Sequence, residues 1–511
     1  MKLGELLRGT DVRTDTPELE ITGIASDSRR VRPGFLFLCL RGTRYDGHAY
    51  AAQAAENGAV CVIGEEAVGG VKNMLLTRSS RITESFLWHN FTGRPLEGDG
   101  MAKVAVTGTA GKTSVVFTLR HILRSAGRRV GVITTISALA GDDPISLGEH
   151  GGSSVSDLAG AMTTPDPEYF FGAAAEMKAR GCDVLIYEAS SQSLTLHKTD
   201  AVTPDIAVFT NLSSEHLDCH GTMENYFAAK ARLMESAKLG IVNVDDPYMR
   251  RLPMMFPGKP ILTCSQEPAN VADTDICALR YRSLGADGVE YVYFSDEAVF
   301  RIRTPQIGRH SVFNTMQAAV CAIRLGVDPL TVKEALACMN GVDGRLCRVT
   351  FSEPEDAAFP AEVFIDYAHT PDALEAALST LGEIKRGRLI VLFGCGGDRD
   401  RTKRPKMAEA AQKYADFTIV TSDNPRTEDP ARILDEIVRG LDRAKPYAVI
   451  HDRREAIRYA VNEAGEGDLI LLAGKGHEKY EITADGKHPF DEEQIVRDAV
   501  HDRCSGKRPK P

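Results

Sequence analysis

The chain has 511 residues, and its 61 Lys and Arg against 71 Asp and Glu give a net charge of -10. This acidic balance argues against a nucleic-acid coat or a membrane-surface protein, although it allows a local basic pocket for phosphates. Hydrophobic residues make up 43% and charged residues 26% of the chain, values typical of a soluble globular protein and not of a disordered one. At about 150 residues per domain, the length predicts roughly three domains.

The sequence contains no obvious targeting or membrane segment. No apolar run reaches about 18 residues, so we expect no transmembrane helix. Near the N-terminus, Glu5 and Arg8 interrupt the apolar stretch, which argues against a secretory signal. The 11 cysteines are scattered from Cys39 to Cys504 without a CxxC pair, a pattern that favours neither a disulfide framework nor a zinc site. We therefore expect a protein of the reducing cytoplasm.

The first block, residues 1–98, reads as a small α/β domain. Short apolar runs at 35–40 and 59–63 predict strands, and the helical stretch between them ends at Gly58, a favourable C-cap. Residues 93–100, GRPLEGDG, have the Gly, Pro and acidic composition of a linker.

The second block, residues 99–341, predicts a parallel sheet. Apolar strands are expected at 103–106, 130–133, 184–187, 206–209 and 240–244. Helices are expected between most of them, beginning with 113–125, and a hairpin at 289–302 precedes a helix at 312–325. Strands that alternate with helices form a parallel sheet whose binding loops lie at the carboxyl ends of the strands.

The third block, residues 342–511, predicts a second, Rossmann-like α/β unit. Its strands are expected at 363–365, 389–393, 417–420 and 469–472, each followed by a polar or Gly-rich loop. The basic, Pro-rich tail at 503–511 is expected to be frayed. The predicted fold is thus α/β with three domains, and the TGTAGKT loop at residues 107–113 indicates that the central one is a P-loop-type parallel-sheet ATPase domain.

The strongest single motif is TGTAGKT at residues 107–113, between a predicted strand and a predicted helix. Backbone N–H groups and the helix N-terminus bind phosphate there, Lys112 can reach the terminal phosphates, and the Thr113 hydroxyl can ligate Mg²⁺. The general P-loop pattern has Gly where Val106 stands, so the alternative is a Gly-rich turn that merely joins strand to helix. The predicted ATP-binding residues of this loop are Gly108, Thr109, Ala110, Gly111, Lys112, Thr113 and Ser114.

Two further residues could complete a metal site at the same sheet edge. Glu188 follows the apolar run VLIY, and His216 follows the strand at 206–209. Carboxylate and imidazole are suitable ligands for a second divalent ion. Taken alone, His216 is more typical of a loop histidine that is satisfied by hydrogen bonds than of a metal ligand.

An ordered series of segments spans nearly the whole chain and resembles the Mur ligases, which build the peptide stem of the bacterial cell wall. The matching segments are TGTAGKT, MTTPD (162–166), YEASSQSL (187–194), NLSSEHLDCHGTMENYFAAKARL (211–233), FNTMQAAVCA (313–322), DGRLCRV (343–349), DYAHTPDAL (366–374), GCGGDRDRTKRP (394–405), SDNPRTEDP (422–430) and AGKGHEKYE (473–481). The last three resemble the branch that adds 2,6-diaminopimelate.

The resemblance implies an ATP-dependent amide ligase of peptidoglycan synthesis, and hence a role in cell-wall biogenesis, cell shape and cell division. ATP would phosphorylate the γ-carboxylate of UDP-N-acetylmuramoyl-L-alanyl-D-glutamate. The amine of meso-2,6-diaminopimelate would then attack the acyl phosphate, and phosphate would leave. Lys112 and Mg²⁺ ions would offset the concentrated negative charge. The partners are then small molecules, with no nucleic acid or membrane, and the protein is expected to be a monomer.

The resemblance also assigns roles within the central and third blocks. Lys230, in a predicted helix at 226–236, matches a lysine that is carbamylated in the family and so becomes a ligand of Mg²⁺; from composition alone it would be a solvated helix lysine. The implied catalytic residues are Lys112, Lys230 and His216, and the implied metal ligands are Thr113, Glu188, His216 and Lys230. Asn314, Arg345 and Asp366 match positions around ATP, where helix capping or a surface charge is the alternative.

Contacts with the UDP-muramoyl-dipeptide are implied in the first two blocks. They fall on Ser26, Ser28, Thr43, Thr163, Thr164, Ser190 and Lys198, and residues 1–98 would form the UDP-binding domain. The chain departs from the family pattern at Leu196 and Lys198, where relatives commonly have Gln and Arg. Ala110 replaces a common Asn, so one hydrogen bond of the phosphate loop is in doubt.

The segment DNPR, residues 423–426, bears on which amino acid is added. Diaminopimelate differs from lysine by a distal carboxylate, which the rigid fork of an arginine binds with two parallel hydrogen bonds. Sites built around such a polar group reject an analogue that lacks it by about 10⁴ or more. Arg426 is the predicted selectivity residue, and the Arg of this motif is absent from lysine-adding relatives. The diaminopimelate-binding residues implied for residues 342–511 are Arg399, Asp423, Asn424, Pro425, Arg426, Gly474 and Glu478.

Two other interpretations remain open. Another ligase of the wider group, such as a folylpolyglutamate or cyanophycin synthetase, shares the phosphate loop, but the DNPR and GKGHE motifs argue against it. A P-loop switch or motor would hydrolyse nucleotide regardless of amino acid. The basic run from Arg399 to Lys406 is interpreted as a solvated face, since it lacks the interleaved aromatics of a nucleic-acid patch.

Overall fold

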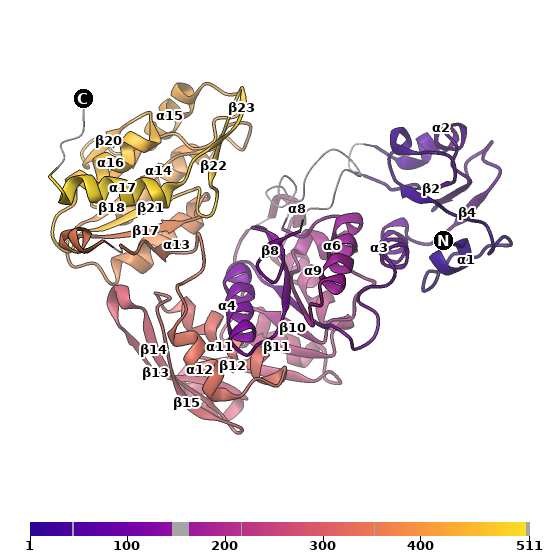
Figure 1. The fold of residues 1–511 in the computed structure, drawn as a ribbon, viewed down its shortest axis with the longest axis horizontal. Coiled ribbons are helices and arrows are strands. Elements are labelled where there is room, and N and C mark those ends of the chain that lie inside the picture. Colours follow the sequence, from indigo (N-terminus) through magenta and orange to yellow (C-terminus); the bar gives the residue numbers. More distant parts are fainter. Residues whose placement is uncertain (43–44, 146–162, 216, 352, 507–511) are drawn as a thin grey trace. The chain divides into compact units, whose positions relative to one another are not determined.

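The computed structural model describes residues 1–42, 45–145, 163–215, 217–351 and 353–506 (Figure 1). The chain divides into two compact units. The first comprises Met1–Cys277, Ser295–Glu297 and Phe313–Val332, and the second comprises Ala278–Phe294, Ala298–Val312 and Lys333–Pro511. Each unit contains parallel strands joined through helices, as the alternation of the sequence predicts.

The N-terminal part of the first unit is a small parallel sheet. Its strands, in spatial order, are β1 (Gly23–Ala25), β2 (Phe35–Leu38), β3 (Cys61–Gly64) and β4 (Met74–Leu76). The helices around it are α1 (Leu3–Leu6), α2 (Ala51–Glu56) and α3 (Ser80–Phe91). Strand β2 is buried on both faces, because Leu36 and Leu38 contribute to one hydrophobic cluster and Phe37 to another.

The second sheet has 11 strands in the order β15-β14-β13-β12-β11-β10-β5-β9-β6-β7-β8. They are β5 (Ala102–Thr107), β6 (Val130–Ile133), β7 (Ala138–Ala140), β8 (Asp143–Pro144), β9 (Val184–Glu188), β10 (Ile206–Phe209), β11 (Leu239–Asn243), β12 (Ile261–Ser265), β13 (Ile276–Ser283), β14 (Val289–Ser295) and β15 (Val299–Thr304). Strands β6, β9, β5, β10, β11 and β12 run parallel, so their carboxyl ends share one edge. The phosphate loop and Glu188 lie at that edge.

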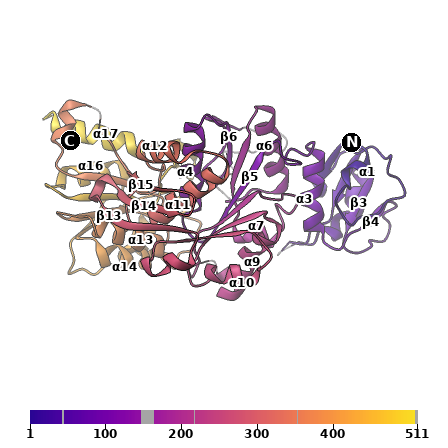
Figure 2. The same ribbon diagram turned by 90° about the horizontal axis from the view of Figure 1, so that it is seen from below.

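Helices connect and cover this sheet, as Figures 1 and 2 show. They are α4 (Lys112–Ser125), α6 (Pro167–Ala179), α7 (Ser191–Thr195), α8 (Leu217–His220), α9 (Met223–Ser236), α10 (Leu252–Met255), α11 (His310–Arg324) and α12 (Pro329–Ala337). Helix α9 begins at an N-cap, where the Thr222 hydroxyl accepts a hydrogen bond from the backbone N–H of Asn225. Its inner face buries Phe227, Leu233 and Met234, and this places Lys230 in the interior.

The sheet of the second unit has the order β16-β17-β21-β18-β19-β20. The strands are β16 (Cys347–Arg348), β17 (Glu362–Asp366), β18 (Leu389–Phe393), β19 (Phe417–Val420), β20 (Tyr447–Val449) and β21 (Leu469–Ala473). All pairs are parallel except that of β16 with β17. A separate hairpin joins β22 (Tyr480–Thr483) to β23 (Gly486–Pro489).

Two hydrophobic clusters cover the faces of this sheet. Leu389, Val391 and Phe393 of β18 pack on one face with residues of α13 (Pro371–Gly382), α14 (Lys403–Tyr414) and α15 (Pro430–Val438). Ile390 and Leu392 pack on the other with α16 (Arg453–Glu463) and α17 (Glu492–Cys504). Burial of both faces explains why the strands read as continuous apolar runs instead of alternating ones.

The α/β class and the predicted strands at 103–106, 184–187, 206–209, 389–393 and 469–472 are confirmed. The domain limits at 98/99 and 341/342 stay predictions. Sequence reasoning missed the β22–β23 hairpin, because β23 is exposed throughout and has no apolar period. The solvated-face interpretation of 399–406 is wrong at Arg404, whose side chain is fully buried and pairs with Glu428 and Glu436.

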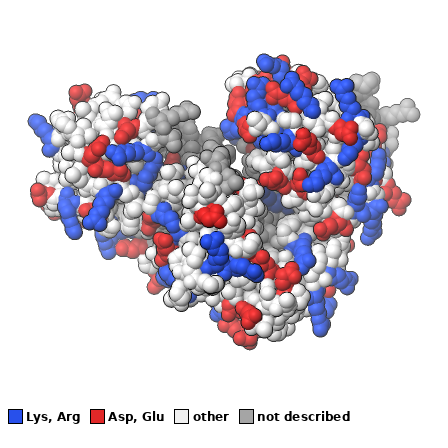
Figure 3. Space-filling view, turned by 180° about the vertical axis from the view of Figure 1, so that it is seen from behind, with Lys and Arg blue, Asp and Glu red and all other residues white. Residues whose placement is uncertain are grey.

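The described surface mixes both signs of charge. On the face drawn in Figure 3, Lys and Arg lie among Asp and Glu. None of the described helices is long and apolar enough to cross a membrane. Every one of the 11 cysteines is a free thiol. The tail at 507–511 lies outside the described residues.

Candidate active site

Two glycines give the phosphate loop its shape. Gly108 and Gly111 have φ values of 148° and 84°, which L side chains rarely adopt. A Cβ on Gly108 would lie 1.8 Å from the Thr210 hydroxyl oxygen, and one on Gly111 would lie 2.5 Å from Asn314 Oδ1. The predicted nucleotide residue Asn314, on α11, is therefore held against the loop.

The residue after β10 fixes the middle of this loop. The backbone N–H of Ala110 donates to Asn211 Oδ1 at 2.9 Å, and Asn211 Nδ2 donates to the Ala110 carbonyl at 3.2 Å. The Thr210 hydroxyl donates to the same carbonyl at 2.7 Å. The Ala110 N–H is thus already used inside the protein. Asn211 thus supplies the amide bonds that hold the Ala110 peptide.

Side chains of the loop also point inward. The Thr109 hydroxyl lies 3.1 Å from Tyr226 Oη and accepts a bond from the Ser213 N–H. Lys112 Nζ donates to the carbonyls of Gly108 and Thr109 at 3.0 and 2.8 Å. Ser114 is half-buried in the first turn of α4.

A buried carboxylate faces the start of α4. Glu188, at the end of β9, is 1% exposed. Its oxygens accept hydrogen bonds from the hydroxyls of Thr113 at 2.8 Å and Thr135 at 3.2 Å, and no described cation forms an ion pair with it. Burying an unpaired carboxylate is costly, and hard oxygen ligands suit Mg²⁺. The donor set therefore fits a divalent cation held by Glu188 and Thr113.

Lys230 is buried beside the same loop, which overturns the solvated-lysine alternative. Its side chain is 1% exposed, and its Nζ donates to the Gly108 carbonyl at 2.8 Å and lies 4.7 Å from the centre of the Tyr226 ring. Burial, together with the nearby Lys112 cation, brings the pKa of Lys230 well below its ordinary value. A neutral amine is a nucleophile, whereas an ammonium is not.

Three residues expected to bind the muramoyl-peptide gather next to Glu188. The buried Thr164 hydroxyl donates to the Glu188 carbonyl at 2.8 Å and accepts from the Ser190 N–H. Lys198 is 5% exposed, donates to the Thr164 carbonyl and pairs with Asp166 at 2.9 Å. Thr163 is half-buried beside Thr164. Lys198 thus presents a cation at this point, as the family's arginine would.

The expected uridine contacts divide into two kinds. Ser26 is exposed, whereas Ser28 is buried and donates its hydroxyl to Gln53 Oε1 at 2.9 Å. The Ser28 hydroxyl therefore has an internal partner. Thr43 and the proposed ligand His216 lie outside the described residues.

In the second unit, Asp366 ends β17 and Arg345 lies close to it. The Asp366 oxygens accept the N–H groups of Leu346 at 2.7 Å and Ala368 at 2.8 Å. Burial raises the pKa of Asp366, and Arg345 partly offsets that effect. The Arg345 guanidinium also lies 5.5 Å from the centre of the Tyr367 ring. These two expected nucleotide residues therefore form one cluster.

The DNPR segment leaves β19 in a strained conformation. Arg426 has a φ of 54°, in the left-handed region, and it is half-buried. Its Nη1 donates to the carbonyls of Gly397 at 2.9 Å and Asn424 at 3.4 Å, and its own N–H donates to the Ile482 carbonyl at 3.0 Å. The guanidinium is thus anchored through one nitrogen.

A buried network orients the neighbouring amide. Asn424 Nδ2 donates to Glu478 Oε2 at 2.8 Å, while Asn424 Oδ1 accepts from Lys475 Nζ at 3.0 Å and from the Ile482 N–H at 2.9 Å. Lys475 is fully buried. Sequence reasoning overlooked Lys475, although it stands inside the GKGHE motif. Burial, with Asp423 nearby, raises the pKa of Glu478.

The two loops approach each other closely at Gly474. A Cβ on Gly474 would lie 2.5 Å from Asp423 Oδ2, and its φ is 116°. Burial opposes ionisation of Asp423, but the cations of Lys475 and Arg453 bring its pKa below the ordinary value. Pro425 is buried beside them, whereas Arg399 is exposed and donates only to the Asp398 carbonyl among the described residues.

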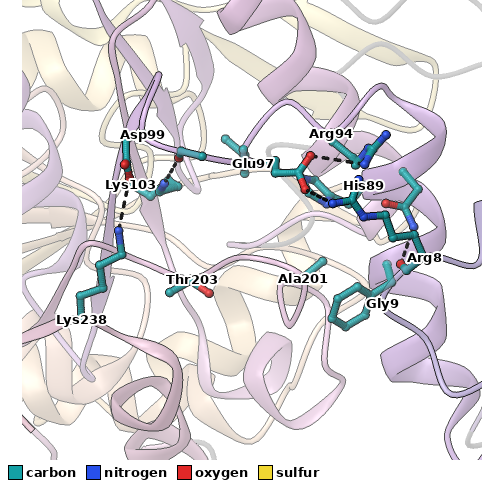
Figure 4. Close-up of a pocket in the computed structure, with 14 residues that line it drawn as sticks. Arg8, Gly9, His89, Arg94, Glu97, Asp99, Lys103, Ala201, Thr203 and Lys238 are labelled. Carbon is teal, nitrogen blue, oxygen red and sulfur yellow. Dashed lines mark hydrogen bonds and ion pairs between the residues drawn. The ribbon is translucent and has the colours of Figure 1, made fainter. Parts of the chain in front are cut away.

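A pocket of about 400 Å³ in the first unit lies away from this chemistry (Figure 4). Its cations are paired: Arg8 and Arg94 with Glu97, and Lys103 and Lys238 with Asp205. Lys103 lies at the start of β5 and Lys238 precedes β11, so the pocket borders the amino ends of the strands. The phosphate loop lies at their carboxyl ends.

Three domain families match the chain. The Mur ligase middle domain matches residues 106–322, the Mur ligase glutamate ligase domain matches 353–476, and the catalytic domain of the Mur ligase family matches 20–76. Together these ranges cover well over half of the sequence. The chain belongs to the Mur ligase family.

Relatives of this Mur ligase extend over its full length. It is 39% identical to the UDP-N-acetylmuramoyl-L-alanyl-D-glutamate–2,6-diaminopimelate ligase of Syntrophomonas wolfei, with 98% of this chain and 99% of that protein covered. It is 37% identical to the protein of the same name from Caldanaerobacter subterraneus, with the same coverage. A solved structure of a ligase of that name has a TM-score of 0.69 at 30% identity and covers 98% of this chain and 99% of that one.

Replacing Asn211 tests how the phosphate loop is held. Asn211→Ala removes both bonds to the Ala110 peptide, and at about 1 kcal/mol per lost bond we expect ATP to bind up to about 30-fold more weakly. Asn73→Ala, which removes a side-chain bond to the Val60 carbonyl in the N-terminal sheet, is the control. Calorimetric titration with a non-hydrolysable ATP analogue measures both. Equal affinities would contradict the assigned role.

Proposed function

We propose that this Mur ligase joins meso-2,6-diaminopimelate to UDP-N-acetylmuramoyl-L-alanyl-D-glutamate with ATP. The substrate assignment rests on the position of Arg426 beside Asn424, which is hydrogen-bonded to Glu478. The side-chain amide of Asn424 is fixed by the buried Lys475. The planar guanidinium of Arg426 suits the second carboxylate of diaminopimelate, and the carboxylate of Glu478 suits its second ammonium.

The phosphate half of the site supports activation of the γ-carboxylate of the D-glutamyl end. The γ-phosphoryl group of ATP passes to a carboxylate oxygen, so ADP leaves and an acyl phosphate forms. Lys112, freed from its loop carbonyls, can follow the phosphates, while the helix N-terminus of α4 favours anions. Mg²⁺ held by Glu188 and Thr113 would supply further positive charge at this place.

The amino-acid half of the site supports attack on the acyl phosphate. Arg426 would bind the distal carboxylate and Glu478 the distal ammonium, with Gly474 contributing its carbonyl and Arg399 the cation for the proximal carboxylate. The free amine then attacks the acyl carbon, and the tetrahedral intermediate expels phosphate. Asp366 and Arg345 would contact the nucleotide, the first at a ribose hydroxyl.

Lys230 supports a modified form of the site. Its pKa lies well below the ordinary value, which favours the neutral amine. That amine would attack the carbon of CO₂, the nitrogen would lose a proton to water, and a carbamate would remain. The product is an anionic oxygen ligand next to the phosphate loop.

We also propose that the enzyme is cytoplasmic, because its nucleotide-linked substrates belong to that compartment. Its proposed oligomeric state is a monomer. Its product would extend the peptide stem of peptidoglycan. A folylpolyglutamate synthase of Mycobacterium tuberculosis has a TM-score of 0.58 at 18% identity, which indicates a shared fold and nothing about the added amino acid.

A coupled assay of phosphate release tests the function. We expect release only when ATP, UDP-N-acetylmuramoyl-L-alanyl-D-glutamate and diaminopimelate are all present, with one amide product formed per phosphate. Omission of each substrate in turn is the control. Release that is independent of the amino acid and the nucleotide sugar would favour a P-loop switch or motor instead.

Substitution of Arg426 tests the choice of amino acid. Arg426→Met removes the fork, so we expect kcat/KM for diaminopimelate to fall by about 10²-fold or more while the low rate with lysine changes little. Arg426→Lys should recover only part of the loss, since an ammonium cannot make two parallel bonds. Arg386→Lys, at an exposed position, is the matched control. An unchanged preference for the diacid would remove the substrate assignment.

Lys230 is tested through its modification as well as its activity. In buffer with carbon-13 bicarbonate, we expect a carbamate resonance that is absent from Lys230→Ala. That variant should lose roughly 10–100-fold in activity and regain part of it with a short carboxylic acid. Lys238→Ala, which removes a half-exposed lysine just beyond the same helix, is the control. Full activity of Lys230→Ala would refute a role for the modified lysine.

A further inference from the structure

One buried arginine joins the two loops of the amino-acid half-site. Arg453 is 1% exposed and is the first residue of α16. Its Nη1 donates to the Ser422 carbonyl at 3.1 Å and its Nη2 donates to the Ala473 carbonyl at 2.9 Å. Its Nε donates to Glu492 Oε1 at 2.6 Å. Three of its donor atoms thus have separate, fixed acceptors.

The two carbonyls belong to strands that do not pair with each other. Ser422 follows β19 and opens the SDNPR loop, whereas Ala473 ends β21 and precedes the GKGHE loop. Strand β18 lies between β19 and β21. The sheet ladder therefore gives no direct bond between the loops, and the Arg453 guanidinium spans the end of β18 to supply one.

The helix ends hold this guanidinium in place. Asp452 caps α16 by accepting the Glu455 N–H, and Asp491 caps α17 by accepting the Gln494 N–H. Arg453 and Glu492 are the residues immediately after these caps. Glu492 is 3% exposed, so the ion pair is almost completely removed from water.

The Arg453 guanidinium also affects the electrostatics of the two loops. The Arg453 cation and Lys475 both favour the ionised form of Asp423, the first residue of DNPR. The carboxylate of Asp423 in turn lies against Gly474 of the other loop. One guanidinium thereby influences the position of both loops and the charge at the point where they meet.

We propose that Arg453, held by Glu492, is a positioning residue that sets the spacing of the DNPR and GKGHE loops and so the fit of the diacid amino acid. The inference rests on the proposed function of these loops. Arg453 touches no substrate in this scheme. It acts through the Ser422 and Ala473 carbonyls, and hence on where Arg426 and Glu478 stand.

A buried ion pair is weak evidence for a purely stabilising role. Apolar residues of similar volume often stabilise a protein as well or better. A guanidinium, however, fixes the direction of three hydrogen bonds at once, which an apolar side chain cannot do. Placement errors of about 1 Å can cost up to about 10² in rate, so such a bridge matters most for binding geometry.

Steady-state kinetics of Arg453→Met and Arg453→Lys test the proposal. With Arg453→Met we expect KM for diaminopimelate to rise by about tenfold or more. KM for UDP-N-acetylmuramoyl-L-alanyl-D-glutamate should stay within about twofold, because the residues expected to bind it all belong to the other unit. Arg453→Lys should fall between wild type and Arg453→Met, since one ammonium can restore one carbonyl bond but not the pair. Arg458→Lys, in a surface ion pair of the same helix, should match wild type.

The split between the two KM values separates positioning from stability. A purely structural role would reduce the folded fraction, lowering the apparent kcat with both KM values unchanged, and that result would overturn the proposal. An unchanged KM for diaminopimelate in a folded Arg453→Met variant would do the same. If that variant does not fold, Arg453→Lys, which keeps a buried cation beside Glu492 but cannot bond both carbonyls, must still raise KM for diaminopimelate selectively.

The wild-type enzyme distinguishes failure of this inference from failure of the function. Wild-type protein that forms no amide with diaminopimelate would refute the proposed function, and the positioning role with it. Wild-type protein that is selective for diaminopimelate, with variants of Arg453 that keep its KM, would refute the positioning role alone.

Discussion

The free-energy cost of burying a charge governs the cluster of functional residues in each of the two units. Water stabilises an exposed ion, so a buried one persists only with a partner or with a shifted pKa. Glu188, Lys230 and Lys475 are each at most 1% exposed. Lys475 has two acceptors and a nearby carboxylate, whereas Glu188 is held by hydroxyl donors and Lys230 by a carbonyl and a ring. Lys475 is therefore a structural cation. Glu188 is suited to binding a cation, and Lys230 is suited to a chemical modification.

This contrast explains the division of labour between the units. Around the phosphate loop, Glu188 is buried with hydroxyl donors and no described ion-pair partner, and the pKa of Lys230 lies well below its ordinary value. Around the DNPR and GKGHE loops, the protein completes its own network, so that Asn424 has one orientation and Glu478 is fixed against it. Buried groups without a charged partner suit a site that binds ions. Side chains that are fixed by hydrogen bonds suit a site that discriminates between amino acids.

The sequence predicted those features that follow from local pattern. The strand–loop–helix run around Lys112 predicted the phosphate loop, and continuous apolar runs predicted the strands of both parallel sheets. Features created by distant contacts were beyond it. The burial of Lys230 depends on which face of α9 packs inward, and the buried Arg404 sits in a run of charged and polar neighbours that reads as solvent-facing.

The same limit applies to residues that act through another residue. Asn211 lies within a motif that resembles the family, but its bonds to Ala110 need the three-dimensional loop. Arg453 begins a helix whose sequence, RREAIRYAVNE, gives no sign that only its first arginine is buried. Residues of this kind are recognised only when the acceptors they bridge are known.

The left-handed backbone of Arg426 has a consequence for how such a site can change over time. Arginine at this φ costs of order 1 kcal/mol relative to glycine, which has no β-carbon, or to asparagine, which adopts this region more readily. Drift toward those residues would make the fold more stable while discarding the fork. An arginine at this position is therefore favoured by what its side chain binds and not by the stability of the backbone.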